Sequence, residues 1–327
     1  MSASSSYARK PVRVAVVGTG NVGSTFAYAL LLSGLAAEIA LIDVNRAKAE
    51  GEAMDLNHTE PFAHPTRIWA GDYPDCAGAV VTVIAAGANQ KPGETRLDLV
   101  KKNAAIFSDI IPKVARHNPG GIILNATNPV DVLTYATLKL SAFPPQRVIG
   151  SGTILDTARF RYLLSEHFGV DSHSVHAYII GEHGDSEVPV WSLANIAGMH
   201  LPDYARSTGM KYDPAALDEI FRCTRDAAYQ IIQRKGATYF AVAAGLMRIV
   251  EAILRDHGTV MSVSSLVTNY YGIDDLCLSL PTVVDGSGVR RQIRLELNQQ
   301  EQEGLHKSAA VLRNTIDSLD LPKPVAA

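Results

Sequence analysis

A glycine-rich turn near the start of this 327-residue chain constrains its fold more than any other feature. The apolar run VRVAVV, residues 12–17, leads directly into GTGNVG, which places glycines at positions 18, 20 and 23. Helical periodicity then begins near Val22 and continues to Gly34. A buried strand, a glycine-rich turn and a helix in this order predict a site where phosphate groups meet the positive end of the helix.

Each of the three glycines has its own physical reason in such a turn. Gly18 permits the tight turn, Gly20 lets the backbone approach a pyrophosphate, and Gly23 lets the helix pack closely on the strand. Asp43 ends the next apolar run, EIALID. Its carboxylate can accept hydrogen bonds from both ribose hydroxyls and repels a 2′-phosphate, which predicts NAD rather than NADP as cofactor. The alternative is a tight turn that binds nothing.

The remaining periodicity predicts the fold class. Apolar runs at residues 79–87, 121–129 and 147–153 alternate with helical stretches, which is typical of a Rossmann-type, doubly wound parallel α/β sheet. After about Thr153 the pattern changes to mixed α+β. It predicts long helical material from Leu217 to Val250, three antiparallel strands of which SLVTNYYGI, residues 265–273, is the first, and a closing helix from Gln299 to Leu319. We expect a flexible tail at 1–10, an NAD-binding domain at 11–152, a catalytic domain at 153–320 and a tail at 321–327.

Composition excludes several classes of function. Hydrophobic residues make up 47% and charged residues 19%, and the net charge of −3 gives no reason to expect nucleic acid or a membrane surface as a partner. No run of the sequence is long enough to cross a bilayer. Cys76, Cys223 and Cys277 are scattered, without a C-x-x-C pair, so we expect no metal site. We therefore predict a cytoplasmic protein in a reducing compartment.

The segment IIGEHGDSEVP, residues 179–189, places His183 in a glycine-flanked turn after a strand. Asp156 and Arg159, in TILDTARFR, share one face of the preceding helix. A carboxylate beside an imidazole fixes its tautomer and favours its protonated form, and a guanidinium binds a substrate carboxylate. Taken singly, these residues are also explained by a structural histidine and an intrahelical salt bridge. Their occurrence together predicts an acid–base site with an anion clamp.

A second polar segment, GANQKPGETRLDLV at residues 87–100, follows the third apolar run. A loop at the carboxyl end of a strand in a doubly wound sheet stands over the ligand crevice. Gln90 and Arg96 are its long polar members. We predict a lid that closes and brings Arg96 to a polarised carbonyl oxygen, with a solvated loop charge as the alternative.

From about Lys10 to Leu319 the sequence resembles the lactate and malate dehydrogenases, and most closely the bacterial L-lactate dehydrogenases. The resemblance rests on VVGTGNVGS, IDVNRAKAEGEAMDLNH, AAGANQKPGETRLDLV, NATNPVDVLTY, GSGTILDTARFR and IIGEHGDSEVPVWS. It implies reversible hydride transfer between NADH and pyruvate giving (S)-lactate, the last step of fermentative glycolysis. The alternatives are a malate or other 2-hydroxy acid dehydrogenase of the same family, and, in another class, a non-catalytic NAD-sensing module.

The resemblance implies a role for each matching position. His183 is the acid–base residue, Asp156 orients it, Arg159 grips the substrate carboxylate and Arg96 polarises the carbonyl. Further substrate contacts are implied for Asn128 and Thr238, and a cis peptide bond for Asn128–Pro129. Cofactor contacts are implied at positions that all lie in the first half of the chain: Gly18, Gly20, Val22, Gly23, Asp43, Lys48, Tyr73, Gly87, Ala88, Thr127 and Ser151.

Two further expectations follow from the resemblance. Malate dehydrogenases similar to this chain usually carry arginine at the position of Gln90, so the neutral glutamine favours pyruvate over oxaloacetate. Arg161 and His176 resemble the fructose 1,6-bisphosphate site of bacterial relatives, at an interface within a homotetramer. A solvated arginine and an ordinary strand histidine, at an interface that needs no sugar, are the alternative for these two positions.

Overall fold

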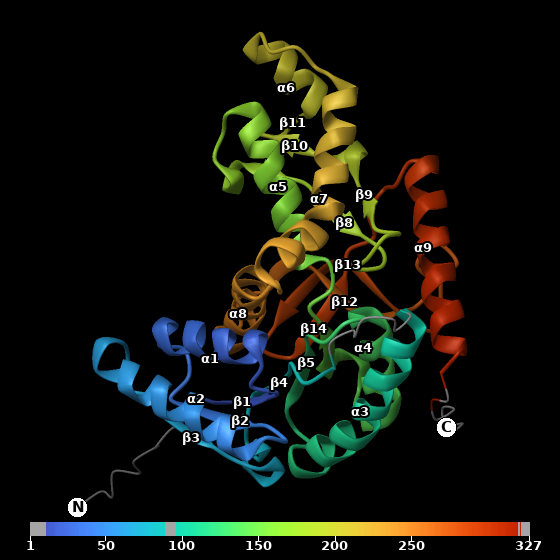
Figure 1. Cartoon of the computed structure of the whole chain (residues 1–327). Coiled ribbons are helices and arrows are strands. Elements are labelled where there is room, and N and C mark those ends of the chain that lie inside the picture. Colours follow the sequence, from blue (N-terminus) through green and yellow to red (C-terminus); the bar gives the residue numbers. More distant parts are fainter. Residues whose placement is uncertain (1–10, 89–95, 320, 322–327) are drawn as a thin grey trace, which may run out of the picture.

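A computed structural model describes residues 11–88, 96–319 and 321, without the side chain of Arg96 (Figure 1). Within these residues one sheet has the strand order β14-β13-β12-β6-β5-β4-β1-β2-β3. Its strands are β1 (Arg13–Val17), β2 (Glu38–Ile42), β3 (Arg67–Ala70), β4 (Val81–Ile84), β5 (Ile122–Asn125), β6 (Val148–Gly150), β12 (Thr259–Val267), β13 (Leu276–Asp285) and β14 (Gly288–Gln292).

The first six strands are parallel and covered on both faces. Each neighbouring pair from β3 through β2, β1, β4 and β5 to β6 is parallel. Along β1, Val14 and Val16 belong to a core shared with helices α1 (Asn21–Ser33) and α8 (Phe240–Leu254). Ala15 and Val17 belong to a core shared with α3 (Arg96–His117) on the opposite face. This two-sided burial confirms the predicted doubly wound sheet.

The C-terminal strands extend this sheet. Strand β13 pairs antiparallel with both β12 and β14, and β12 joins β6 antiparallel with Ser264 opposite Gly150. The sequence predicted three antiparallel strands here, but set the first one at residues 265–273. The structure shows that β12 ends at Val267, because Asn269 and Tyr271 adopt positive φ in the turn that follows.

The remaining helices and short strands complete the fold (Figure 1). Helix α5 packs against α7, beside a small three-stranded sheet of order β11-β10-β7 and a β8-β9 pair. The bounds are α2 (Arg46–Thr59), α4 (Val130–Ser141), α5 (Ile154–Phe168), α6 (Leu201–Thr208), α7 (Pro214–Lys235), α9 (Gln299–Asp317), β7 (Val175–His176), β8 (Ile179–Ile180), β9 (Val188–Pro189), β10 (Asn195–Ile196) and β11 (Met199–His200). Five 3-10 turns are described: η1 (Glu60–Phe62), η2 (Tyr73–Cys76), η3 (Pro145–Arg147), η4 (Ser172–Ser174) and η5 (Trp191–Leu193).

Two details differ from the sequence-based expectation. The helical material predicted from Leu217 to Val250 is interrupted, because α7 ends at Lys235, where Gly236 caps it with a left-handed φ of 86°, and α8 begins at Phe240. The strand β3, RIWA, was not anticipated, since four residues at a sheet edge carry little periodicity. None of the described helices is long and apolar enough to span a membrane.

Candidate functional site

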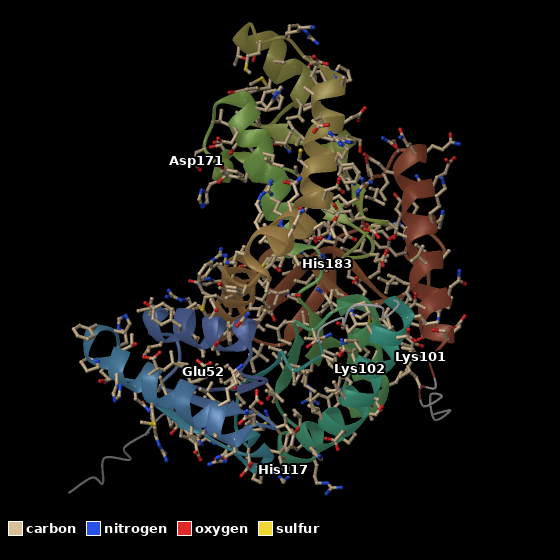
Figure 2. All side chains as sticks on the ribbon, in the orientation of Figure 1. Glu52, Lys101, Lys102, His117, Asp171 and His183 are labelled. Atoms are coloured by element: carbon tan, nitrogen blue, oxygen red, sulfur yellow. The ribbon has the colours of Figure 1, made fainter. Side chains whose placement is uncertain are left out.

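The candidate site lies at the carboxyl ends of the parallel strands. Figure 2 shows His183 between the large sheet and the helices α5 and α7. Strands β1, β4, β5 and β6 all end on this side, so the turns that follow them face a common region. Crevices outside the carboxyl ends of strands are where doubly wound sheets bind ligands.

The glycine turn has the steric form that a bound pyrophosphate needs. A Cβ on Gly18 would lie 2.4 Å from the backbone nitrogen of Ala86, and one on Gly23 would lie 1.9 Å from the carbonyl oxygen of Gly18. At Gly20, which caps α1, a Cβ would meet no described atom within 4 Å. Gly18 and Gly23 are therefore fixed by packing, while Gly20 borders open space at the helix N-terminus.

Asp43 faces this turn. Its Oδ2 accepts hydrogen bonds from the backbone N–H of Thr19 at 2.7 Å and from the Thr19 hydroxyl at 3.0 Å. Its Oδ1 accepts the backbone N–H of Asn45 at 2.9 Å. A half-buried carboxylate, positioned at the mouth of the turn and held by three donors, fits the ribose of NAD.

Other predicted cofactor positions meet at the ends of β4, β5 and β6. The Thr127 hydroxyl donates to the carbonyl of Ala86 at 2.9 Å, and a Cβ on Gly87 would lie 2.4 Å from the Thr127 methyl. The backbone N–H of Ser151 donates to the carbonyl of Asn125 at 2.8 Å. The predicted positions Gly87, Thr127 and Ser151 therefore lie on neighbouring turns at the carboxyl ends of β4, β5 and β6.

Asn103 links two of these turns, and no sequence motif predicted this role. Its side-chain oxygen accepts the backbone N–H of Ala88 at 2.8 Å, and its side-chain nitrogen donates to the carbonyl of Asn128 at 2.8 Å. Asn103 is almost fully buried in α3. It joins a predicted cofactor position to a predicted substrate position, and the peptide bond between Asn128 and Pro129 is cis, as the resemblance implied.

Three predicted cofactor residues lie on separate elements. Val22 is in the first turn of α1 and packs partly on the core, and Lys48 is exposed at the start of α2. Tyr73 is half-buried in η2, with the Lys113 ammonium 5.2 Å from its ring centre. Val22 is itself part of the glycine turn, and no hydrogen bond among the described residues joins the side chain of Lys48 or Tyr73 to that turn.

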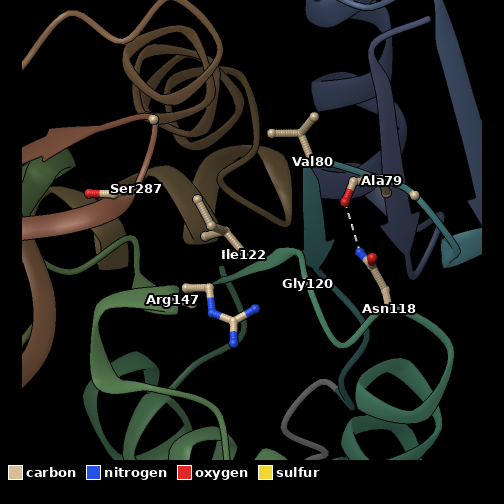
Figure 3. A pocket seen from close by; sticks show the side chains of 9 residues that line it. Ala79, Val80, Asn118, Gly120, Ile122, Arg147 and Ser287 are labelled. Carbon is tan, nitrogen blue, oxygen red and sulfur yellow. Dashed lines mark hydrogen bonds between the residues drawn. The ribbon is translucent and has the colours of Figure 1, made fainter. Parts of the chain in front are cut away.

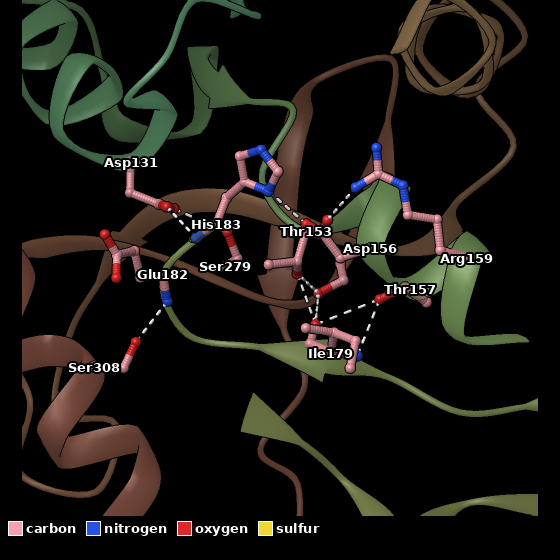
Figure 4. A network of polar contacts seen from close by, with 11 residues as sticks. Asp131, Thr153, Asp156, Thr157, Arg159, Ile179, Glu182, His183, Ser279 and Ser308 are labelled. Carbon is pink, nitrogen blue, oxygen red and sulfur yellow. Dashed lines mark hydrogen bonds and ion pairs between the residues drawn. The ribbon is translucent and has the colours of Figure 1, made fainter. Parts of the chain in front are cut away.

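Three of the four predicted catalytic residues, His183, Asp156 and Arg159, meet closely (Figure 4). His183 Nδ1 lies 2.5 Å from Asp156 Oδ2, and Arg159 Nη1 lies 3.0 Å from Asp156 Oδ1. Asp156 is in the first turn of α5, where the helix dipole favours a negative charge. Because Nδ1 is engaged by the carboxylate, Nε2 is the ring nitrogen that can exchange a proton with a substrate.

Burial and charge set the protonation of this pair. Burial by itself lowers the pKa of His183, but the charge and hydrogen bond of Asp156 outweigh it and raise that pKa to about 9. Burial raises the pKa of Asp156, but the charge and hydrogen bond of His183 together with the charge of Arg159 outweigh burial, so the pKa of Asp156 is lowered. His183 is therefore a cation at neutral pH, paired with a carboxylate.

The other substrate positions are only partly described. Arg96 is the first residue of α3, and its side chain and all of Gln90 lie outside the described residues. Asn128 is exposed at the end of the turn after β5, and Thr238 is half-buried in the link between α7 and α8. The roles predicted for these four residues stay predictions.

The two predicted effector residues lie beside one strand. The Arg161 Nε donates to the carbonyl of Ala177 at 2.9 Å, and its guanidinium lies 5.0 Å from the Tyr178 ring centre. His176, the residue before Ala177, is exposed on β7. The two side chains thus come from neighbouring segments, Arg161 from the part of α5 that follows Arg159 and His176 from β7.

A hollow of about 400 Å³ lies elsewhere (Figure 3). Its lining includes Val80, Ile122 and Arg147, which sit at or before the amino ends of β4, β5 and β6. That is the edge of the sheet opposite the His183–Asp156 pair. In it, the Asn118 side chain already donates to the carbonyl of Ala79 at 2.8 Å.

Two acidic residues near His183 were not predicted from the sequence. Asp131 in α4 is 1% exposed and accepts the backbone N–H of His183 at 2.8 Å. Glu187 is buried in the turn before β9, and its Oε1 has no hydrogen-bond partner among the described residues. Both belong to motifs that were recognised, NATNPVDVLTY and IIGEHGDSEVPVWS, but only tertiary contact shows that they face the imidazole.

Comparison with known proteins matches both halves of the chain. Residues 12–150 match the family model of the lactate/malate dehydrogenase NAD binding domain, and residues 153–320 match that of the lactate/malate dehydrogenase alpha/beta C-terminal domain. A probable L-lactate dehydrogenase of Schizosaccharomyces pombe is 54% identical over 312 residues, covering 95% of this chain and 94% of the relative. An L-lactate dehydrogenase of Acetivibrio thermocellus is 53% identical over 309 residues, covering 94% of this chain and 98% of the relative.

Solved structures of two lactate dehydrogenases have a similar fold. The crystal structure of the minor L-lactate dehydrogenase from Enterococcus mundtii, in the ligands-bound form, superposes with a TM-score of 0.91 at 42% identity. It covers 94% of this chain and 98% of the other. A lactate dehydrogenase from a Medee basin deep-sea metagenome library superposes with the same TM-score at 44% identity.

Proposed function

Because this chain belongs to the lactate and malate dehydrogenase family, we propose that it interconverts pyruvate and (S)-lactate with His183 as its acid–base group. It is an NAD-dependent oxidoreductase of the L-lactate dehydrogenase type. The observation that carries the proposed role is the 2.5 Å contact between His183 and Asp156, with Arg159 on the same carboxylate.

Bound NADH supplies the hydride, and the chain holds the proton and the substrate. In pyruvate reduction the protonated His183 donates from Nε2 to the keto oxygen as negative charge develops there. In lactate oxidation the neutral imidazole removes the hydroxyl proton. Asp156 keeps Nδ1 protonated in both directions, so the proton transferred is always the one on Nε2.

Arg159 positions the substrate. Its Nη1 is used by Asp156, and a guanidinium has five N–H donors in a planar fork, so donors are left for the two oxygens of a carboxylate. Its side chain is 13% exposed, which keeps the ion pair from being screened by water. Arg96, arriving with the predicted lid, adds a second positive charge at the keto oxygen.

The cofactor positions follow the same proposal. Gly18, Gly20 and Gly23 admit the pyrophosphate, Asp43 binds the ribose, and the turns carrying Gly87, Thr127 and Ser151 flank the nicotinamide side. The open space at Gly20 and the three donors on Asp43 support this assignment. Residues 11–152 then serve as the NAD-binding domain and residues 153–320 as the catalytic domain.

The experiment for this function follows NADH absorbance with pyruvate and with a panel of other 2-keto acids. We expect steady NADH oxidation with pyruvate and a much lower kcat/KM with oxaloacetate. NADH binding without turnover of any keto acid would support the non-catalytic NAD-sensing module instead.

Regulation and assembly belong to the same proposal. A homotetramer in which Arg161 and His176 of two facing subunits bind fructose 1,6-bisphosphate is supported by the placement of Arg161 beside β7, the strand that carries His176. We expect the sugar phosphate to lower the KM for pyruvate, because it binds the assembled form. Titration at low pyruvate measures this, and a flat response would contradict it. A cytoplasmic location stays a prediction.

A further inference from the structure

The backbone of His183 is held by a second buried carboxylate, separate from the one that holds its ring (Figure 4). Asp131 Oδ2 accepts the backbone N–H of His183 at 2.8 Å, and Asp131 Oδ1 accepts the hydroxyl of Ser279 at 2.9 Å. Asp131 is 1% exposed and Ser279 is fully buried. Both carboxylate oxygens therefore meet donors in a place that water does not reach.

These contacts join three distant parts of the chain. Asp131 lies in the first turn of α4, on the parallel side of the fold, while Ser279 comes from β13 and His183 from the turn between β8 and β9. The turn that carries the imidazole is thus fixed to the half of the fold that carries the nucleotide turn. A displacement of about 1 Å between reacting groups can cost on the order of a hundredfold in rate, so such an anchor matters.

We infer that Asp131 is a positioning residue for the proton transfer, which fixes the His183 backbone and adds a negative charge that favours the imidazolium. The inference rests on the proposed role of His183. Burial raises the pKa of Asp131, and the His183 N–H, the Ser279 hydroxyl and the positive charge of His183 act against this rise. Asp131 and Asp156 therefore approach the same cation from the backbone side and from the ring side.

Several charged or titratable groups face this pair. Asp156 and Arg159 come from α5, Glu187 from the turn before β9, and Cys277 from β13. Burial raises the pKa of the Cys277 thiol well above its usual value, so this group stays neutral. Burial and the charge of Asp156 raise the pKa of Glu187 to about 9, so Glu187 titrates in the same range as His183 and needs its own control.

The Asp131→Asn variant removes the negative charge of residue 131 and keeps its two hydrogen bonds. The asparagine carbonyl can still accept the His183 N–H, and its amide can donate to the Ser279 hydroxyl, so both hydrogen bonds survive without the charge. In wild type, kcat/KM for pyruvate falls as pH rises through the pKa of His183. We expect the midpoint of this fall to move down by roughly half to one pH unit in the variant, because a nearby negative charge has been removed.

Ser308→Ala is the matched control. The Ser308 hydroxyl accepts the backbone N–H of Glu182 at 2.7 Å, which is an uncharged anchor one residue before His183. In the Ser308→Ala variant we expect kcat/KM for pyruvate to fall with the same pH midpoint as in wild type. Asp131→Ala, which also removes the anchor, should lower kcat at every pH by about a hundredfold. The Asn comparison is repeated in a Glu187→Gln background, where the same downward move is expected.

The pH profile of Asp131→Asn tests the role of Asp131, whereas turnover by the wild-type chain tests the proposed function. A profile of Asp131→Asn that superimposes on wild type overturns the inference, as does an equal displacement in Ser308→Ala. Should Asp131→Ala fail to fold, the Asn variant still decides. NADH affinity, measured by fluorescence, should be unchanged in Asp131→Asn. A wild-type chain that binds NADH and reduces no keto acid would instead refute the proposed function.

Discussion

Replacing His183 with asparagine is expected to lower kcat for pyruvate reduction by about a thousandfold, the scale of a lost general acid. Asparagine can still form a hydrogen bond with Asp156, but it cannot deliver a proton to the keto oxygen. The glycine turn and Asp43 are untouched by the change, so NADH affinity should stay within a factor of about two. The measurements are steady-state NADH oxidation and a fluorescence titration with NADH.

The surface offers a matched control for this variant. His173 pairs with Asp171 at 2.8 Å, and its side chain is 94% exposed. The His173→Asn variant removes a histidine–aspartate pair of the same kind away from the crevice and should keep wild-type kcat. If His183→Asn turned over pyruvate at the wild-type rate, His183 would have no place in the chemistry.

Substrate selectivity should respond to Gln90→Arg almost as strongly. Oxaloacetate carries a second carboxylate, which a neutral glutamine leaves unpaired in a closed site. An unpaired buried charge costs about 3–5 kcal/mol, so an arginine should change the ratio of kcat/KM for oxaloacetate and pyruvate by roughly a hundredfold or more. We expect the ratio to narrow or to reverse in favour of oxaloacetate.

The test compares both substrates in wild type and variant under one set of conditions. Gln146→Arg serves as the control, because Gln146 is exposed in η3 near the amino ends of the strands and gains the same charge there. Its substrate ratio should match that of wild type. A wild-type preference for oxaloacetate would defeat the assignment to pyruvate, whatever the variant does.

The sequence predicted those parts of the site that local patterns determine. The glycine turn needs only strand, turn and helix in succession, and the structure shows why Gly18 and Gly23 tolerate no side chain. Asp156 and Arg159 share a helix, so their common face followed from spacing alone. Their meeting with His183 was predicted from their occurrence together after a dinucleotide-binding turn, although each residue taken singly has an ordinary structural explanation.

What escaped prediction depends on contacts between distant segments. Asp131 lies 52 positions before His183, and Asn103 lies 25 before Asn128, so no periodicity links either pair. The pairing of β12 with β6 rests on one register, Ser264 opposite Gly150, and could not be read from strand patterns. Burial of these polar residues in otherwise apolar surroundings is visible only in the folded chain.

The central claim is that one imidazole carries the proton in both directions, and the pH dependence of the wild-type enzyme tests it most directly. The pKa of His183 is raised to about 9, so the imidazolium is present below that pH and is lost above it. We predict that kcat/KM for pyruvate reduction is level at neutral pH and falls through about pH 9, while kcat/KM for lactate oxidation rises over the same range. The claim would be contradicted if kcat/KM changed with pH in the same sense for reduction and oxidation. It would also be contradicted if kcat/KM for pyruvate reduction stayed level through this range.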